Sequence, residues 1–169
     1  MHIIAAKAAG FFEALKPEFQ TYIQNVLANA KMLAETLKNN GFKIYSGGTD
    51  THLMLVDLRP FGVKGNIASE SLCRANITCN KNGIPFDTEK PMITSGIRLG
   101  SQAATTRGFG LKEFEKVGEL ITKVIKGLSE NPEDNSKVEN EVRQEVVNLC
   151  SNFPIYKNLN KWSVLVRKK

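Results

Sequence analysis

The stretch Thr94-Ser95-Gly96-Ile97-Arg98-Leu99-Gly100 is a predicted strand that carries one fixed cation at its end. A guanidinium offers a rigid fork of N–H donors that fits a carboxylate through two hydrogen bonds, which a lysine cannot do. Gly96 and Gly100 carry no side chain, so a small ligand can approach the backbone closely there. We interpret Arg98 as a candidate clamp for the carboxylate of an amino acid. The alternative is a surface arginine that closes a strand.

Two further strands are predicted upstream, at residues 42–45 and 52–57. The polar turn Ser46-Gly47-Gly48-Thr49-Asp50 between them favours an antiparallel pair. The second strand contains the unbroken apolar run Leu53-Met54-Leu55-Val56, which predicts a central strand that is covered on both faces. The polar stretch from Asn76 to Thr88 is predicted to be a loop.

Helices are predicted around these strands from apolar residues at steps of three and four. One begins without a capping residue at His2, and the next begins at Pro17 and ends at Gly41 as a left-handed cap. The remaining predicted helices cover Asn66–Ala75, with Ile67, Leu72 and Cys73 facing inward; Leu111–Lys126; and a last helix that starts at the capping box Ser136–Glu139, with Val138, Val142, Val146 and Leu149 facing inward. The predicted fold class is α+β: a small sheet of about three strands with helices packed on it, and one long leading helix.

Composition narrows the classes of function. Five of the 23 basic residues and none of the 17 acidic residues lie in 157–169, so the rest of the chain carries 18 basic and 17 acidic residues and is nearly neutral. Nucleic-acid binding therefore depends on the tail alone and is the weakest hypothesis. Three cysteines at irregular spacing and two histidines fit no metal site, and a reduced, cytoplasmic setting is expected. No run approaches the roughly 18 apolar residues of a membrane span.

Several isolated side chains receive structural interpretations. His52 is expected to lie at a strand start with a satisfied ring. Asp50 and Asp57 are single acids at separate strand ends, so a catalytic carboxylate pair is not expected. Arg107 is expected to make a structural ion pair near a helix start.

Six segments of the chain stand out together: Met1–Ala8, Ser46–Leu53, Arg74–Asn82, Thr94–Gly100, Thr106–Phe109 and Phe153–Tyr156. In this order they resemble the C-terminal part of serine hydroxymethyltransferase, a pyridoxal-phosphate enzyme of the aspartate-aminotransferase-like fold family. The resemblance covers residues 1 to about 156.

The resemblance implies a site for two ligands. Arg98 would hold the carboxylate of serine or glycine, in agreement with the interpretation of its guanidinium. Asn82 would lie at the tetrahydrofolate site, although it also suits the role of shaping the loop from Gly83 to Pro85. Lys90-Pro91-Met92 stands where many members have Ser-Pro-Phe, so the resemblance allows backbone contacts to folate here but no aromatic contact.

The resemblance also implies what the rest of the enzyme would contribute. The family's Schiff-base lysine follows Thr-Thr-His, and no lysine here has that setting. We therefore expect no catalytic residue in this chain, a helix at 1–16 that belongs to a missing large domain, a small domain at 17–156, and a basic tail at 157–169 that is either foreign or packed on the body. The parent would be a homodimer or homotetramer that uses pyridoxal phosphate, and this chain alone would be inactive. The alternative is a non-catalytic binding or dimerisation module, or a gene remnant.

Overall fold

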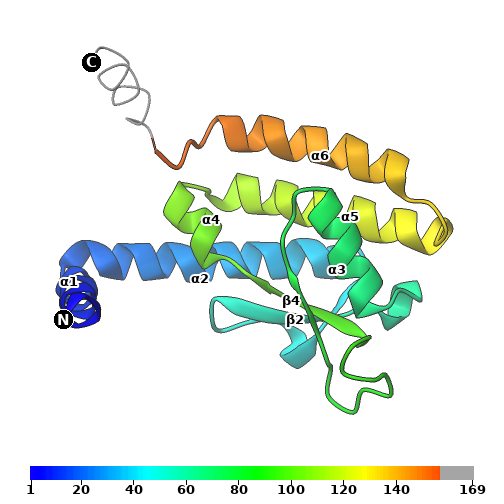
Figure 1. The fold of residues 1–169 in the computed structure, drawn as a ribbon, viewed down its shortest axis with the longest axis horizontal. Coiled ribbons are helices and arrows are strands. Elements are labelled where there is room, and N and C mark those ends of the chain that lie inside the picture. The colour runs from blue at the N-terminus through cyan, green and yellow to red at the C-terminus, as the bar shows by residue number, and fades with distance from the viewer. Residues whose placement is uncertain (157–169) are drawn as a thin grey trace.

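A computed structural model describes residues 1–156, and the predicted tail at 157–169 lies outside the described residues. The described part is a mixed helix and sheet structure, which confirms the α+β class (Figure 1). The helices are α1 (His2–Ala14), α2 (Pro17–Asn39), α3 (Gly65–Arg74), α4 (Gln102–Arg107), α5 (Leu111–Glu130) and α6 (Ser136–Ser151), with short 3-10 turns η1 (Tyr45–Gly47) and η2 (Arg59–Phe61); the strands are β1 (Lys43–Ile44), β2 (Leu53–Asp57), β3 (Asn80–Asn82) and β4 (Gly96–Gly100).

The sheet has four antiparallel strands in the order β1-β2-β4-β3, where about three were predicted. The fourth strand, β3, lies inside the segment predicted to be a loop. Its sequence Asn80-Lys81-Asn82 lacks apolar alternation, and its extended conformation comes from pairing with β4. The prediction of an antiparallel pair between β1 and β2, with β2 at an inner position, is confirmed.

The two faces of the sheet have different surroundings. Met54, Val56, Ile97 and Leu99 are buried in the core. Leu53 and Leu55 lie on the opposite face and are only half-buried, so the prediction that β2 is covered on both faces was wrong. Successive side chains of a strand alternate between the faces. An apolar run four residues long therefore places two of its members on the face that the helices do not cover.

The helices form the other side of the core. Figure 1 shows α6, α5 and α2 stacked side by side, with the strands beyond α2. Pro17 occupies the first turn of α2 and Gly41 adopts a left-handed φ of 93° after it, as predicted. The two long helices contribute buried side chains that meet in one cluster with the sheet: Ala30, Leu33, Ala34 and Leu37 from α2, and Phe114, Leu120, Ile121, Val124, Ile125 and Leu128 from α5.

The N-terminal end of the described structure lies away from this core. No residue of α1 is buried, and Figure 1 shows α1 at the end of α2 that projects beyond the sheet. The predicted apolar stripe of α2 is also exposed at its start, where Phe19 and Ile23 retain more than a third of their surface. The stripe becomes a buried face only from Val26 onward.

Helices α3 and α6 differ from their predictions in detail. Helix α3 begins at Gly65, not at Asn66, and its buried face carries Leu72 as predicted but leaves Ile67 and Cys73 exposed. The capping box predicted for α6 is absent. The N-cap residue is Asn135, and the Ser136 N–H donates to Asp134 Oδ1 at 2.9 Å.

Glu139 binds side chains of α3 instead of capping the N-terminus of α6. Its carboxylate accepts hydrogen bonds from Arg74 Nε and Nη2, each at 2.7 Å, and from Ser71 Oγ at 2.6 Å. These bonds join α6 to α3, and the bond from Arg74 lowers the pKa of the Glu139 carboxyl below its ordinary value. The inward positions predicted for α6 are confirmed: Val142 is fully buried, and Val138, Val146 and Leu149 pack against the core.

Candidate functional site

Arg98 lies at the middle of β4, not at its end. The register places it opposite Leu55 of β2 and opposite Asn80 of β3. Gly96 and Gly100 flank it on the same face of the sheet, where Gly100 is exposed and Gly96 is buried beside Ile84. The residue is exposed, and within residues 1–156 its guanidinium has no hydrogen-bond or ion-pair partner. The fork of N–H donors is therefore free to bind an anion.

A hollow of about 1050 Å³ opens beside Arg98. Its wall runs from the segment before β3, through β4 and α4, to the C-terminal end of α6. A volume of this size accommodates a small organic ligand. Cys79 lies in the wall, and burial raises the pKa of its thiol to about 11, so this thiol is neutral near pH 7 and is a poor nucleophile.

The second arginine of the hollow has a structural role. The guanidinium of Arg107 donates to the backbone carbonyls of Cys150 and Phe153, the former at 3.0 Å. The prediction of an ion pair near a helix start was therefore wrong: Arg107 is the last residue of α4, and it binds the last turn of α6 and the chain just after it. Among the described residues that line the hollow, Arg98 is therefore the cation that has no protein partner.

Asn82 lies on the same face of the sheet as Arg98. It pairs with Gly96, two positions from Arg98 along β4. Its Nδ2 donates to the Gly83 carbonyl at 2.8 Å, which is the contact expected of the loop-shaping role. Its position also lets the side chain face a ligand that lies across β3 and β4.

The segment Lys90–Met92 belongs to the loop between β3 and β4. All three residues are exposed, and Met92 retains 73% of its surface. The N–H groups of Ile93 and Thr94 donate to the Lys90 carbonyl at 2.9 and 3.0 Å and close a turn. The segment is thus presented at the surface on a loop that returns directly to β4.

That turn is also attached to the N-terminus of α3. The first helical N–H group, of Gly65, donates to the Thr94 carbonyl, and that of Asn66 donates to the Ile93 carbonyl, both at 2.9 Å. A Cβ on Gly65 would collide with Thr94 Oγ1 and would lie 2.5 Å from the Gly96 carbonyl. Glycine is needed at this position because the helix and the strand approach too closely for a side chain.

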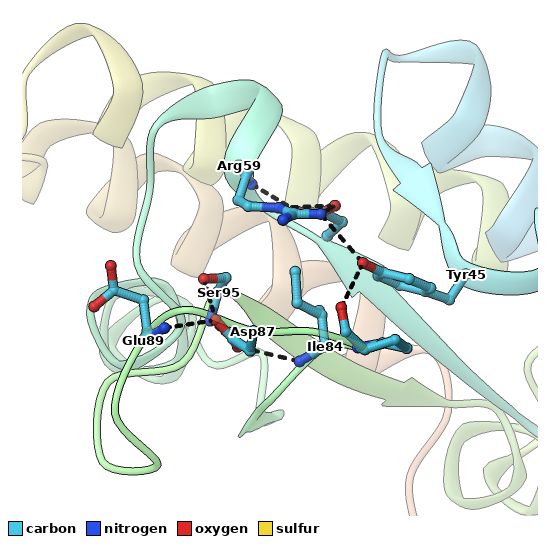
Figure 2. Close-up of polar contacts among 8 residues, drawn as sticks. Tyr45, Arg59, Ile84, Asp87, Glu89 and Ser95 are labelled. Carbon is cyan, nitrogen blue, oxygen red and sulfur yellow. Dashed lines mark hydrogen bonds and ion pairs between the residues drawn. The ribbon is translucent and has the colours of Figure 1, made fainter.

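Sequence reasoning missed Asp87, which organises the start of the same loop (Figure 2). Its carboxylate accepts hydrogen bonds from the N–H groups of Ile84, Glu89 and Ser95 and from Ser95 Oγ, at 2.7 to 3.1 Å. Burial raises the pKa of the Asp87 carboxyl, but the four bonds outweigh burial and hold the pKa well below its usual range. An Asp two residues before an N–H donor is the local signal of an Asx turn.

A second acid on the same side of the sheet is neutralised by an arginine. Asp57 is buried, and its carboxylate accepts from the Arg59 N–H, Nε and Nη2. Arg59 Nη2 also donates to Tyr45 Oη, whose hydroxyl donates to the Pro85 carbonyl at 3.5 Å (Figure 2). Asp57 is therefore an ion-paired structural acid and forms no carboxylate pair with Asp50. Within residues 1–156 no cluster of three metal-ligating side chains is found, and no described helix is long and apolar enough to span a bilayer.

Comparison with known proteins identifies the family. The family model described as serine hydroxymethyltransferase matches residues 1–121. The chain belongs to the serine hydroxymethyltransferase family. It is 84% identical over 159 residues to a serine hydroxymethyltransferase of Pelagibacter ubique, covering 94% of this chain and 36% of that relative. It is 65% identical over 157 residues to one of Marinomonas sp., covering 93% of this chain and 37% of the relative.

The chain thus spans a little over a third of the length of the serine hydroxymethyltransferases that it matches, in their C-terminal part. The family depends on pyridoxal phosphate, with tetrahydrofolate as co-substrate. The hollow beside Arg98 offers a free guanidinium for an anion, but no lysine is among the described residues that line it. The residues that line the hollow therefore fit a carboxylate.

Proposed function

We propose that this chain is the small-domain portion of a serine hydroxymethyltransferase and that Arg98 binds the carboxylate of serine or glycine. One observation carries the proposal: the Arg98 guanidinium lies without a protein partner within residues 1–156, between two glycines and beside a hollow. A guanidinium–carboxylate pair of this kind contributes about 1.5–3 kcal/mol. The chain's part in the reaction is to hold the amino acid by this carboxylate in a fixed orientation.

The tetrahydrofolate site is proposed to include Asn82 and the exposed segment from Lys90 to Met92. Asn82 ends β3, and Lys90–Met92 lies in the loop between β3 and β4, so a ligand that lies along this loop would contact both. The carboxamide of Asn82 can donate and accept hydrogen bonds, which suits a pterin ring. Met92 offers a flexible apolar side chain where an aromatic ring is common in the family.

The parent reaction converts serine and tetrahydrofolate to glycine and 5,10-methylenetetrahydrofolate. Pyridoxal phosphate, when bound, serves as the electron sink for cleavage of the bond between Cα and Cβ. We propose that its lysine and its other partners belong to the large domain of a homodimer or homotetramer, and that residues 1–156 alone do not catalyse the reaction. The first helix, α1, is proposed to belong with that large domain, because none of its residues is buried here.

A chimera tests the role of Arg98. The C-terminal part of the Pelagibacter ubique relative, 84% identical to this chain, is replaced by this chain, and serine cleavage is measured. Arg98→Lys is expected to raise the KM for serine about tenfold or more, because the bidentate pair is lost. The control is Arg143→Lys, an exposed arginine of α6 that does not line the hollow. A KM and kcat equal to those of the unsubstituted chimera would refute the role of Arg98.

The second candidate function is a non-catalytic module. The observation that favours it is the described lining of the hollow beside Arg98, which includes no lysine. Mixing the purified chain with pyridoxal phosphate, followed by borohydride reduction and peptide mapping, separates the two functions. Labelling of one lysine in high yield would contradict the non-catalytic function. Weak labelling spread over many exposed lysines would support it.

A further inference from the structure

Asp87 joins two segments that carry different parts of the proposed site. Its Oδ2 accepts from the N–H groups of Ile84 and Ser95, at 3.1 and 2.9 Å. Its Oδ1 accepts from the Glu89 N–H at 3.0 Å and from Ser95 Oγ at 2.7 Å. Each carboxylate oxygen thus bonds once to the 84–89 turn and once to Ser95, as Figure 2 shows.

The two segments lead directly to the groups proposed to bind ligands. Lys90 follows Glu89 in the chain, and Arg98 follows Ser95 by three residues along β4. The Ser95 carbonyl also accepts from the Leu58 N–H at 3.0 Å, so Ser95 is held by the end of β2 as well. The carboxylate therefore fixes the beginning of the Lys90–Met92 segment relative to β4.

The backbone between these bonds is strained and needs to be held. Thr94 is a buried, β-branched residue with φ of 62°, a conformation that such residues rarely adopt. Strained backbone persists only where surrounding contacts determine it, and such positions concentrate at ligand sites. The Asp87 bonds fix one side of Thr94 at Ser95, and the N–H groups at the start of α3 fix the other side.

We propose that Asp87 is a positioning residue that sets the place of the Lys90–Met92 segment relative to Arg98. The proposal deepens the proposed function and rests on it for the identity of the ligand. Asp87 does not contact the ligand in this scheme; it acts through the backbone N–H groups and the hydroxyl that it binds. Loss of its carboxylate is expected to weaken tetrahydrofolate binding more than serine binding, because Arg98 stays in the β-ladder with β2 and β3.

The bonding pattern predicts a graded series of variants. Ser95→Ala removes only the hydroxyl bond to Oδ1. Asp87→Asn retains one acceptor oxygen. With that oxygen at the Oδ2 position, the N–H groups of Ile84 and Ser95 keep their acceptor, and the Ser95 hydroxyl can turn to accept from the new amide. Only the Glu89 N–H then loses its acceptor. Asp87→Ala removes all four bonds. The matched control is Asp134→Asn. In the unsubstituted chain the Asp134 carboxylate accepts a hydrogen bond from the Ser136 N–H at the start of α6.

Amide hydrogen exchange on the full chain tests the positioning role without any ligand. Exchange at Glu89 and Ser95 is expected to rise about tenfold or more in Asp87→Ala, and by less in Asp87→Asn and Ser95→Ala. Exchange in α5 is expected to stay unchanged. Equal exchange in all variants, or a uniform rise that includes α5, would overturn the proposal.

The chimera then measures the effect on ligands. In Asp87→Ala the KM for tetrahydrofolate is expected to rise about tenfold, with kcat and the KM for serine within about twofold and with intermediate values in Asp87→Asn. Parallel changes in both KM values and kcat would overturn the positioning role. An inactive unsubstituted chimera would count against the proposed function alone, since the exchange experiment decides the role of Asp87 in the chain itself.

Discussion

Gly96 shows how closely the backbone packs beside Arg98. A Cβ at this position would lie 2.6 Å from Ile84 Cγ2 and 2.7 Å from the Val56 carbonyl oxygen. The carbonyl belongs to the neighbouring strand and cannot move without breaking the ladder. We predict that Gly96→Ala lowers the free energy of unfolding by about 1–3 kcal/mol, as overpacking does.

Urea unfolding measures this change against a matched control. Gly10→Ala adds the same methyl group to exposed helix α1, where nothing lies within 4 Å of the new Cβ. That substitution is expected to change the free energy of unfolding by no more than about 1 kcal/mol, in the stabilising direction, because alanine favours helix more than glycine does. A Gly96→Ala protein as stable as the control would contradict the packing described for β4.

The ionisation of Asp87 predicts a pH dependence of stability. Its pKa in the folded chain lies well below that of the unfolded chain, which is about 3.9. The stabilisation from this group is therefore complete above about pH 5 and is lost progressively as the pH falls through the unfolded-state pKa toward the folded-state pKa. Asp87→Asn is expected to reduce Tm clearly at pH 6 and by less at pH 2.5.

Thermal melts at the two pH values test this dependence. Asp50→Asn is the control, since Asp50 is an exposed acid in the turn before β2. The control is expected to show the same small difference from the unsubstituted chain at both pH values. A Tm difference for Asp87→Asn that is as large at pH 2.5 as at pH 6 would show that its hydrogen bonds do not depend on the charged carboxylate.

At the scale of elements, the attachment of α6 to α3 depends on one partly exposed ion pair. Glu139 is almost fully buried, whereas the Arg74 side chain retains 57% of its surface. Removing the carboxylate charge leaves Arg74 free to turn toward water, so the loss is smaller than for a fully buried pair. We predict that Glu139→Gln destabilises the protein by about 1–2 kcal/mol, mainly through weaker hydrogen bonds.

The neighbouring pair on α6 supplies the comparison. Glu141 contacts Lys123 of α5 at 3.0 Å, and both side chains are more than a third exposed. Exposed pairs contribute little, so Glu141→Gln is expected to change the free energy of unfolding by no more than about 0.5 kcal/mol. Urea unfolding of the two variants ranks the contributions. Equal effects would show that the Glu139 pair contributes no more than a surface ion pair.

At the scale of the whole molecule, α1 leaves a row of apolar side chains uncovered. Its exposed apolar side chains include those of Ile3, Ile4, Phe11 and Phe12, with Leu15 just after the helix. An apolar surface of this kind marks an interface or a site of aggregation. We predict that residues 1–15 either project from the body and are cut rapidly by protease, or pair with a second copy of the chain.

Thermolysin digestion combined with size-exclusion chromatography distinguishes these outcomes. Rapid loss of residues 1–15 with a stable remainder indicates a projecting helix. A dimer that the double substitution Phe11→Ser, Phe12→Ser converts to monomer indicates pairing. A protease-resistant monomer with α1 intact would contradict both outcomes and would mean that the helix packs on the chain's own core.

Several elements were predictable because their signals are local. Pro17 and Gly41 mark the ends of α2, and the three-to-four spacing of apolar residues places α5 and α6 correctly within a few residues. The turn before β2 favours the antiparallel pair with β1. Arg98 was singled out from its own chemistry and its flanking glycines. In each case the residues that determine the feature lie within one element or one turn.

The tertiary structure decided the features that join distant segments. The polar strand β3 exists because it pairs with β4, and the open face of β2 depends on where the helices pack. Glu139 suits a helix cap by its position in the sequence, but Arg74, 65 residues away, binds it instead. Asp87 acquires its role only when Ser95 returns beside it. Local periodicity carries the preference of the backbone for helix or strand, whereas the partner of a charged or polar group depends on which segments the folded chain brings together.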